Sequence, residues 1–191
     1  MTDKPQTAEP AWVASLSGLH DQVWQRLVRG VADRRAPARH PTLATVGLDG
    51  GAEARTVVLR AVDRSAGTLE IHTDALSGKV AELQRQPRAA LHVWDSRVRL
   101  QMRLRVTVAF LDTANRWQRI PPASRLAYGG EPAPGAPLRS PHDYRETTDP
   151  ERFLVLCCTL QELDVLHLGG GGHRRARFDR VDDFIGVWLA P

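Results

Sequence analysis

The sequence predicts a mainly β, antiparallel fold with a few helices, and two observations support this fold class. From residue 41 onward, short apolar runs with a period of two are separated by turn residues, as is typical of strands. Helical periodicity occurs in one N-terminal segment and otherwise only in short stretches between the strands. Closely linked strands with helices as insertions indicate an antiparallel barrel or sandwich.

The first elements are a polar N-terminus and a long amphipathic helix. We expect residues 1–10 to be disordered, because they are polar and terminal. Apolar residues then recur at spacings of three and four and predict a helix over residues 11–32. Pro37 and Pro41 prevent the helix from continuing.

Strands are predicted over most of the remaining chain, and a single domain over residues 11–191. The strands are expected at 42–48, 54–62, 68–73, 89–94, 98–110, 153–160, 163–168 and 174–180. Short helices are predicted at 78–85 and 113–120. The segment 127–150 is rich in proline, glycine and charge and is predicted to be a long loop.

Composition restricts the class of protein. The hydrophobic fraction of 42% and the charged fraction of 25% are typical of a soluble globular protein. The sequence shows neither a membrane-spanning apolar run nor the pattern of a secretory signal, so we expect a cytoplasmic protein that binds no membrane. The seven histidines and the adjacent Cys157 and Cys158 lack metal-ligand spacing, so no metal is predicted.

The net charge of +4 favours anionic partners in general. The arginine-rich face over residues 97–105 carries no interleaved aromatic residues, so we do not expect nucleic-acid binding. Of the 26 basic residues only Lys4 and Lys79 are lysines, which leaves 24 arginines. A single arginine is therefore weakly informative, whereas Lys79 stands out.

Lys79 lies in the first turn of the short predicted helix, behind the possible caps Asp74 and Ser77. A lysine at this place opposes the helix dipole. The conflict disappears if an anion sits at the helix N-terminus, where free N–H groups point outward. On these residues alone, a phosphate site and a solvated lysine on a surface turn are both open.

The segment RTVVLR (55–60) predicts a strand with arginines on opposite faces. Arg55, Val57 and Leu59 would share one face, and Thr56, Val58 and Arg60 the other. A half-buried strand with snorkelling arginines is favoured on this segment alone. Further along the chain, Gln101 lies on the polar face of its strand, and four glycines precede His173 and Arg175.

Taken in order, these segments resemble the pyridoxamine 5′-phosphate oxidase-like family of FMN-binding split barrels. The matching sequences are RTVVLR (55–60), HTDALSGK (72–79), the strands over 89–110, the Pro-x-x-Ser element at 121–124 and HRRARFDR (173–180). The resemblance covers most of the chain from His40 to Pro191. It implies an antiparallel, Greek-key-like split β-barrel with FMN as its cofactor.

The resemblance also implies the cofactor-binding residues and the assembly. FMN contacts are expected at Arg55, Thr56, Val57, Val58, Leu59, Arg60, His72, Thr73, Ser77, Gly78, Lys79, Gln101 and Arg175. Thr73, Ser77 and Lys79 would hold the phosphate, and Gly78 stands where the family usually has a basic residue. In this family FMN lies between two subunits, so the resemblance implies an obligate homodimer.

On the substrate side, the resemblance points to Arg60, Ser124 and His173 as catalytic residues, with His173 as a possible proton shuttle. Two family residues that bind the substrate phosphate, a tyrosine and an arginine, correspond here to Arg116 and Ile120. These departures predict an FMN-dependent oxidoreductase with an altered site for its small-molecule substrate. The alternative is a split-barrel protein that binds flavin or haem without turnover.

Overall fold

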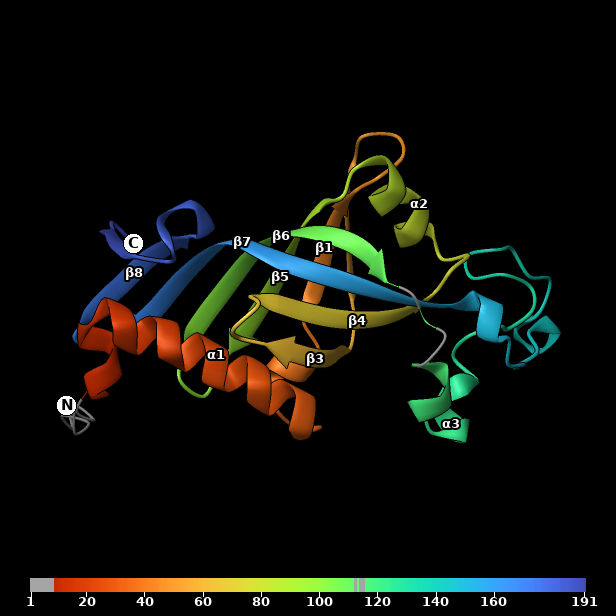
Figure 1. The fold of residues 1–191 in the computed structure, drawn as a ribbon, viewed down its shortest axis with the longest axis horizontal. Coiled ribbons are helices and arrows are strands. Elements are labelled where there is room, and N and C mark those ends of the chain that lie inside the picture. Colours follow the sequence, from red (N-terminus) through yellow and green to blue (C-terminus); the bar gives the residue numbers. More distant parts are fainter. Residues whose placement is uncertain (1–8, 112, 114–115) are drawn as a thin grey trace, which may run out of the picture.

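The computed structural model describes residues 9–111, 113 and 116–191, and its N-terminal part is helical (Figure 1). The helix predicted over 11–32 is interrupted: a 3-10 turn, Ala11–Ala14, precedes α1, Leu16–Ala32. Ser15 separates the two because its extended backbone lets its side chain accept a hydrogen bond from the Gly18 N–H and cap α1. The predicted disordered segment 1–10 lies outside the described residues except for its last two.

The described strands form one antiparallel sheet. Their bounds are β1 Thr42–Val46, β2 Ala52–Thr56, β3 Leu59–Asp63, β4 Thr68–Asp74, β5 Arg88–Asp95, β6 Leu100–Leu111, β7 Phe153–Gly169, β8 Gly172–Asp179 and β9 Gly186–Leu189. The helix predicted at 78–85 is confirmed as α2, Gly78–Arg85. A four-residue helix, α3, covers Pro122–Arg125.

Several predicted boundaries were wrong. The strand expected over 54–62 is split into β2 and β3 by two residues, and those expected at 153–160 and 163–168 are one strand, β7. In place of a helix over 113–120 there is a 3-10 turn, Trp117–Arg119, and residues 112, 114 and 115 lie outside the described chain. The C-terminal strand β9 was not predicted.

The order of the strands shows how the sheet curls. Neighbours follow the path β2-β1-β5-β6-β7-β4-β3, and β8 pairs with the second half of β7. The edge strands β2 and β3 are not paired with each other, yet only Val57 and Val58 join them. Because two residues span only about 7 Å, the sheet must curl to bring the end of β2 close to the start of β3. This open antiparallel barrel confirms the predicted fold class.

The barrel interior is apolar, and α1 lies across its open end (Figure 1). The period of two predicted for this segment is confirmed in most of β6: Leu100, Met102 and Leu104 are fully buried, while Arg103 and Arg105 are exposed. It was wrong for Phe110, which the pattern places on the apolar face and which is exposed. The buried face of α1 closes this core with Leu19, Val23, Trp24 and Leu27. None of the described helices is long and apolar enough to cross a membrane.

The predicted loop over 127–150 is irregular except for a 3-10 turn, Pro141–Asp143, and one bridge between Glu131 and Arg145. Its base is closed, because the Asp149 N–H donates to the Tyr128 carbonyl at 2.9 Å. Tyr128 packs in a small second core with Ile120, Phe153 and Val155. The segment is therefore anchored beside the ends of β4 and β7.

Candidate functional site

Three predicted phosphate ligands meet where β4 passes into α2. A tight turn links the two elements, with the Leu76 N–H donating to Asp74 Oδ1 at 2.8 Å. Lys79 Nζ donates to Thr73 Oγ1 at 3.0 Å, and Thr73 Oγ1 lies 3.1 Å from Ser77 Oγ. One ammonium and two hydroxyls thus lie together at the start of α2; we call Thr73, Ser77 and Lys79 the α2 cradle.

The N-terminus of α2 is open toward this cradle. The Ser77 side chain does not cap the helix, because it turns to Thr73 instead. Within the described part of the chain, the backbone N–H groups of Gly78 and Lys79 find no acceptor. Free first-turn amides together with the helix dipole favour an anion at this place.

Lys79 is half-buried and forms no ion pair with any described carboxylate. Burial lowers the pKa of its ammonium, the nearby Arg55 guanidinium lowers it further, and Glu82 and Asp74 raise it. A solvated lysine on a surface turn would not be desolvated in this way. The sequence left two interpretations open, a phosphate site and a solvated surface lysine, and the geometry favours the phosphate site.

Arg55 already has a carboxylate partner, which the sequence pattern does not show. From β2 its Nη2 lies 2.9 Å from Glu82 Oε2 on α2, and both side chains also contact the Thr45 hydroxyl. Glu82 is buried, so this pair fixes α2 against the β1–β2 hairpin. Arg55 thus positions the cradle helix and retains little free charge for an anion.

The link between β2 and β3 runs past the same region. The expectation of one strand with strict alternation over 55–60 was wrong, because Val57 and Val58 leave the sheet. The Val57 N–H donates to the Pro41 carbonyl at 3.0 Å, whereas the Val58 N–H has no acceptor among the described residues. The break therefore leaves one backbone donor, the Val58 N–H, free among the described residues.

Arg60 lines a cavity of about 540 Å³ on the outer face of the sheet, a volume typical of small-molecule pockets. The remaining lining residues are Ala61, Glu70, His72, Arg116, Arg119 and Ile120. Arg116 pairs with Glu70. The buried Nε of Arg60 has no hydrogen-bond partner in the described structure. An orphaned buried guanidinium nitrogen fits a site for a polar or anionic ligand.

His72 lies between this cavity and Phe153, whose ring centroid is 5.0 Å from its own. Burial, as the largest cause, and the nearby Arg60 and Arg116 guanidinium groups together lower the pKa of His72 to about 4. His72 is thus neutral at neutral pH. The positive charge of the cavity comes from its arginines.

We expect His72 to make the protein less stable as the pH falls from about 6.5 toward 4. In this range the unfolded chain binds a proton that the folded chain does not, so the free energy of unfolding decreases with falling pH. The contribution is about 1–2 kcal/mol after allowance for partial exposure. Urea unfolding at several pH values should show a shallower decrease for His72→Phe than for the wild type; parallel curves would contradict the assignment.

Gln101 and Arg175 lie far from the cradle within one chain. They flank Leu166 in neighbouring strands, and His173 lies two pairs further on, opposite Leu168. His72 and Leu111 both pair with Val155 of β7, so His72 lies level with Leu111, at the other end of β6 from Gln101. Leu111 and Gln101 are about 33 Å apart along an extended strand, which exceeds the length of one FMN molecule.

Of the other predicted residues, Thr56 is exposed at the end of β2 and Leu59 is fully buried in the core. Ser124 lies half-buried on α3 and does not line the Arg60 cavity. Arg116 and Ile120, which the family resemblance placed at the substrate phosphate, do line it. Glu70 and Arg119 were missed. Glu70 lies two residues before His72 in β4, so both side chains are on the same face, and strand alternation could have predicted Glu70 as a site residue. No sequence pattern pointed to Arg119.

Comparisons with known proteins found similar sequences and structures. The family model of the pyridoxamine 5′-phosphate oxidase FMN-binding domain matches residues 21–112. Pyridoxine/pyridoxamine 5′-phosphate oxidase 2 of Arabidopsis thaliana is 27% identical over 171 residues, covering 79% of this chain and 86% of the relative.

Two solved structures share the fold. A pyridoxamine 5′-phosphate oxidase-related, FMN-binding protein of Nostoc punctiforme has a TM-score of 0.71 at 25% identity, covering 90% of this chain and 96% of that one. PhzG of Burkholderia lata, solved with tetrahydrophenazine-1-carboxylic acid, has a TM-score of 0.70 at 16% identity, covering 90% and 92%.

The fold is a split barrel of the kind these relatives have. The predicted resemblance is confirmed, and the chain is a relative of the pyridoxamine 5′-phosphate oxidase-like proteins.

Proposed function

We propose that this protein is an FMN-dependent oxidoreductase whose substrate site differs from that of pyridoxamine 5′-phosphate oxidases. The observation that carries the proposal is the α2 cradle: a half-buried lysine with no carboxylate partner among the described residues, beside two hydroxyls and an open helix N-terminus. Thr73, Ser77 and Lys79 would hold the FMN phosphate, with the free amides of Gly78 and Lys79. The residues present therefore fit this cofactor.

Bound FMN would supply the redox chemistry by accepting a hydride from the substrate. The chain's own residues bind and orient. The Arg60 side chain lines the cavity and would attract an anionic or polar substrate group, and Arg116 and Arg119 add positive charge to the same cavity. Ile120 contributes an apolar wall where the family has an arginine, so we expect a substrate other than pyridoxamine phosphate.

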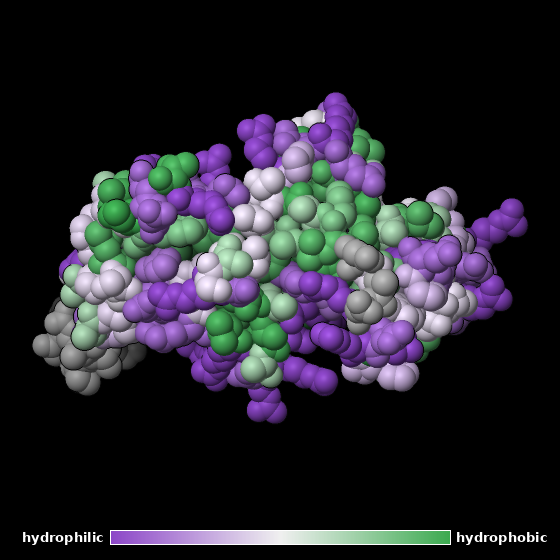
Figure 2. All heavy atoms as spheres, viewed as in Figure 1, coloured by the Kyte–Doolittle hydropathy of each residue, from purple (hydrophilic) through white to green (hydrophobic). Residues whose placement is uncertain are grey.

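We propose that the cofactor site is complete only in a homodimer. Gln101 and Arg175 lie at the far end of the sheet from the cradle, so one FMN reaches both only if a second chain supplies them. In the space-filling view an apolar area lies over the C-terminal half of β6, where Phe110 is 37% exposed (Figure 2). Such an area is suited to a subunit interface.

The visible absorption spectrum of the purified protein tests the function. We expect a flavin spectrum, or its appearance after FMN is added, and bleaching under anaerobic conditions by a suitable amine, alcohol or NAD(P)H donor. Failure to bind FMN would contradict the proposal. A stoichiometric flavin that no donor reduces would favour the alternative of a non-catalytic flavin-binding protein. A haem spectrum would show that the cofactor is haem and not FMN.

Mixed dimers test whether the two halves of the site come from different chains. Lys79→Met and Arg175→Met are each expected to bind FMN poorly as homodimers. In a mixed dimer, one site combines the intact cradle of one chain with the intact Arg175 of the other, so about half of the wild-type FMN content should return. Co-expression with two affinity tags gives the mixed dimer. No recovery would show that Lys79 and Arg175 serve the same site within one chain, or different sites.

A further inference from the structure

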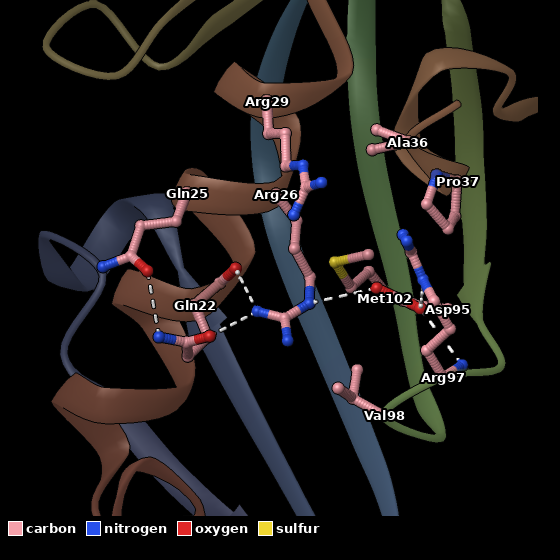
Figure 3. A pocket seen from close by; sticks show the side chains of 11 residues that line it. Gln22, Gln25, Arg26, Arg29, Ala36, Pro37, Asp95, Arg97, Val98 and Met102 are labelled. Atoms are coloured by element: carbon pink, nitrogen blue, oxygen red, sulfur yellow. Dashed lines mark hydrogen bonds and ion pairs between the residues drawn. The ribbon is translucent and has the colours of Figure 1, made fainter. Parts of the chain in front are cut away.

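A second cavity, of about 380 Å³, lies beside α1 at the end of β6 that is remote from His72 (Figure 3). We call it the α1 pocket. Its polar walls are formed by Gln22, Gln25, Arg26, Arg29, Asp95 and Arg97. Its apolar lining consists of Ala36, Pro37, Ala38, Val98 and Met102. It shares no lining residue with the Arg60 cavity or the α2 cradle.

Arg26 is fixed at the centre of this pocket. Its Nη1 donates to the Gln22 carbonyl at 3.1 Å, and its guanidinium lies 5.3 Å from the centre of the Trp12 ring. The side chain is only 17% exposed. No described residue accepts a hydrogen bond from Nη2, and the buried Nε has only the long contact of 3.4 Å with Asp95 Oδ2. The guanidinium is therefore rigid but incompletely satisfied (Figure 3).

The charges around the pocket do not balance. Asp95 is the one carboxylate in its lining, and both Arg26 Nε and Arg97 Nε lie 3.4 Å from it. Arg29 has its own partner, Asp33, at 3.0 Å. Two guanidinium groups thus share one buried carboxylate, which leaves one positive charge without a counter-ion among the described residues. Burial lowers the pKa of Arg26, and Arg97 and Arg29 lower it further, while Asp95 raises it.

We infer that the α1 pocket binds a small organic anion, with a carboxylate or phosphate ester group on an apolar body. The anionic group would satisfy Arg26 Nη2 and Arg97, and the body would pack against Val98 and Met102. A bare inorganic anion leaves the apolar wall uncovered, and a neutral hydrocarbon leaves the guanidinium unsatisfied. The inference does not depend on the proposed flavin function.

Calorimetric titration tests the inference with four probes: phenyl phosphate, benzoate, inorganic phosphate and benzyl alcohol. We expect the two organic anions to bind one-to-one, and at least about tenfold more tightly than the other two probes. Binding should persist in Lys79→Met, which separates this pocket from the α2 cradle. Arg26→Met should weaken it about tenfold or more. Arg34→Met removes an exposed arginine outside the pocket and should change nothing.

A second variant covers the case in which loss of Arg26 disturbs the fold. The Arg97 side chain is 56% exposed, so Arg97→Met is expected to fold and to weaken binding several-fold. The inference is overturned if neither organic anion saturates in the millimolar range. Equal binding of inorganic phosphate or benzyl alcohol, or unchanged affinity in both arginine variants, would overturn it as well.

Discussion

Replacing Lys79 with methionine is expected to weaken FMN binding by about 10- to 100-fold while leaving the fold intact. A hydrogen bond from a charged donor contributes about 1.5–3 kcal/mol, and each 1.4 kcal/mol changes affinity tenfold. Methionine keeps the length and apolar contacts of the side chain. Because the half-buried ammonium lacks a carboxylate partner, its removal should leave the melting temperature of the FMN-free protein unchanged or slightly raised.

Arg85→Met is the matched control for this variant. Arg85 lies in the last turn of the same helix, is exposed, and contacts only the Leu48 carbonyl among the described residues. It removes one positive charge from α2 at the end away from the cradle, so FMN affinity should stay near the wild-type value. Fluorescence quenching of free FMN gives both affinities. An equal loss of FMN affinity in both variants would show that the net charge of α2 matters and not the cradle. Wild-type affinity in Lys79→Met would show that the cradle is not part of the cofactor site.

The cradle was predictable because its residues are local. Ser77 and Lys79 lie within one helical turn, so spacing and dipole arguments place them together. Thr73, at the end of the preceding strand, came from the family resemblance. α2 ends before Pro87, and the period of two in β6 identifies its buried face. Each of these features depends on neighbours a few residues away.

The rest of the site depends on contacts between distant segments. Glu82 neutralises Arg55 across 27 positions, and Arg119 reaches the Arg60 cavity from the segment after β6. The break at Val57 could not be predicted from an apolar run that suits a strand throughout. It arises because β2 and β3 occupy opposite edges of the curled sheet. Strand alternation shows which face a residue occupies, but not which distant charge it meets there.

The Asp74 carboxylate is expected to have the largest effect on stability, because it ties the cradle to β7 and to the long loop. Its oxygens accept hydrogen bonds from the N–H groups of Leu76 at 2.8 Å and Gly129 at 3.1 Å. Arg152 Nη2 lies 2.6 Å away, and both side chains are largely buried. Asp74→Ala leaves the guanidinium without its counter-charge, so we expect a loss of about 3–5 kcal/mol in the free energy of unfolding.

Asp63→Ala is the matched control, since Asp63 also ends a strand and accepts hydrogen bonds in the following turn, from Ser65 and Ala66. It is exposed and pairs with no described arginine, so its loss should cost about 1 kcal/mol or less. Urea unfolding followed by circular dichroism measures both. A double mutant with Arg152→Met then separates the ion pair from the hydrogen bonds: if the buried charge dominates, removing both partners costs less than the two single losses together. Additive losses of unfolding free energy would assign the effect to the hydrogen bonds with the turn and loop amides. A small loss in Asp74→Ala would show that the stability of this region does not depend on the Asp74 contacts.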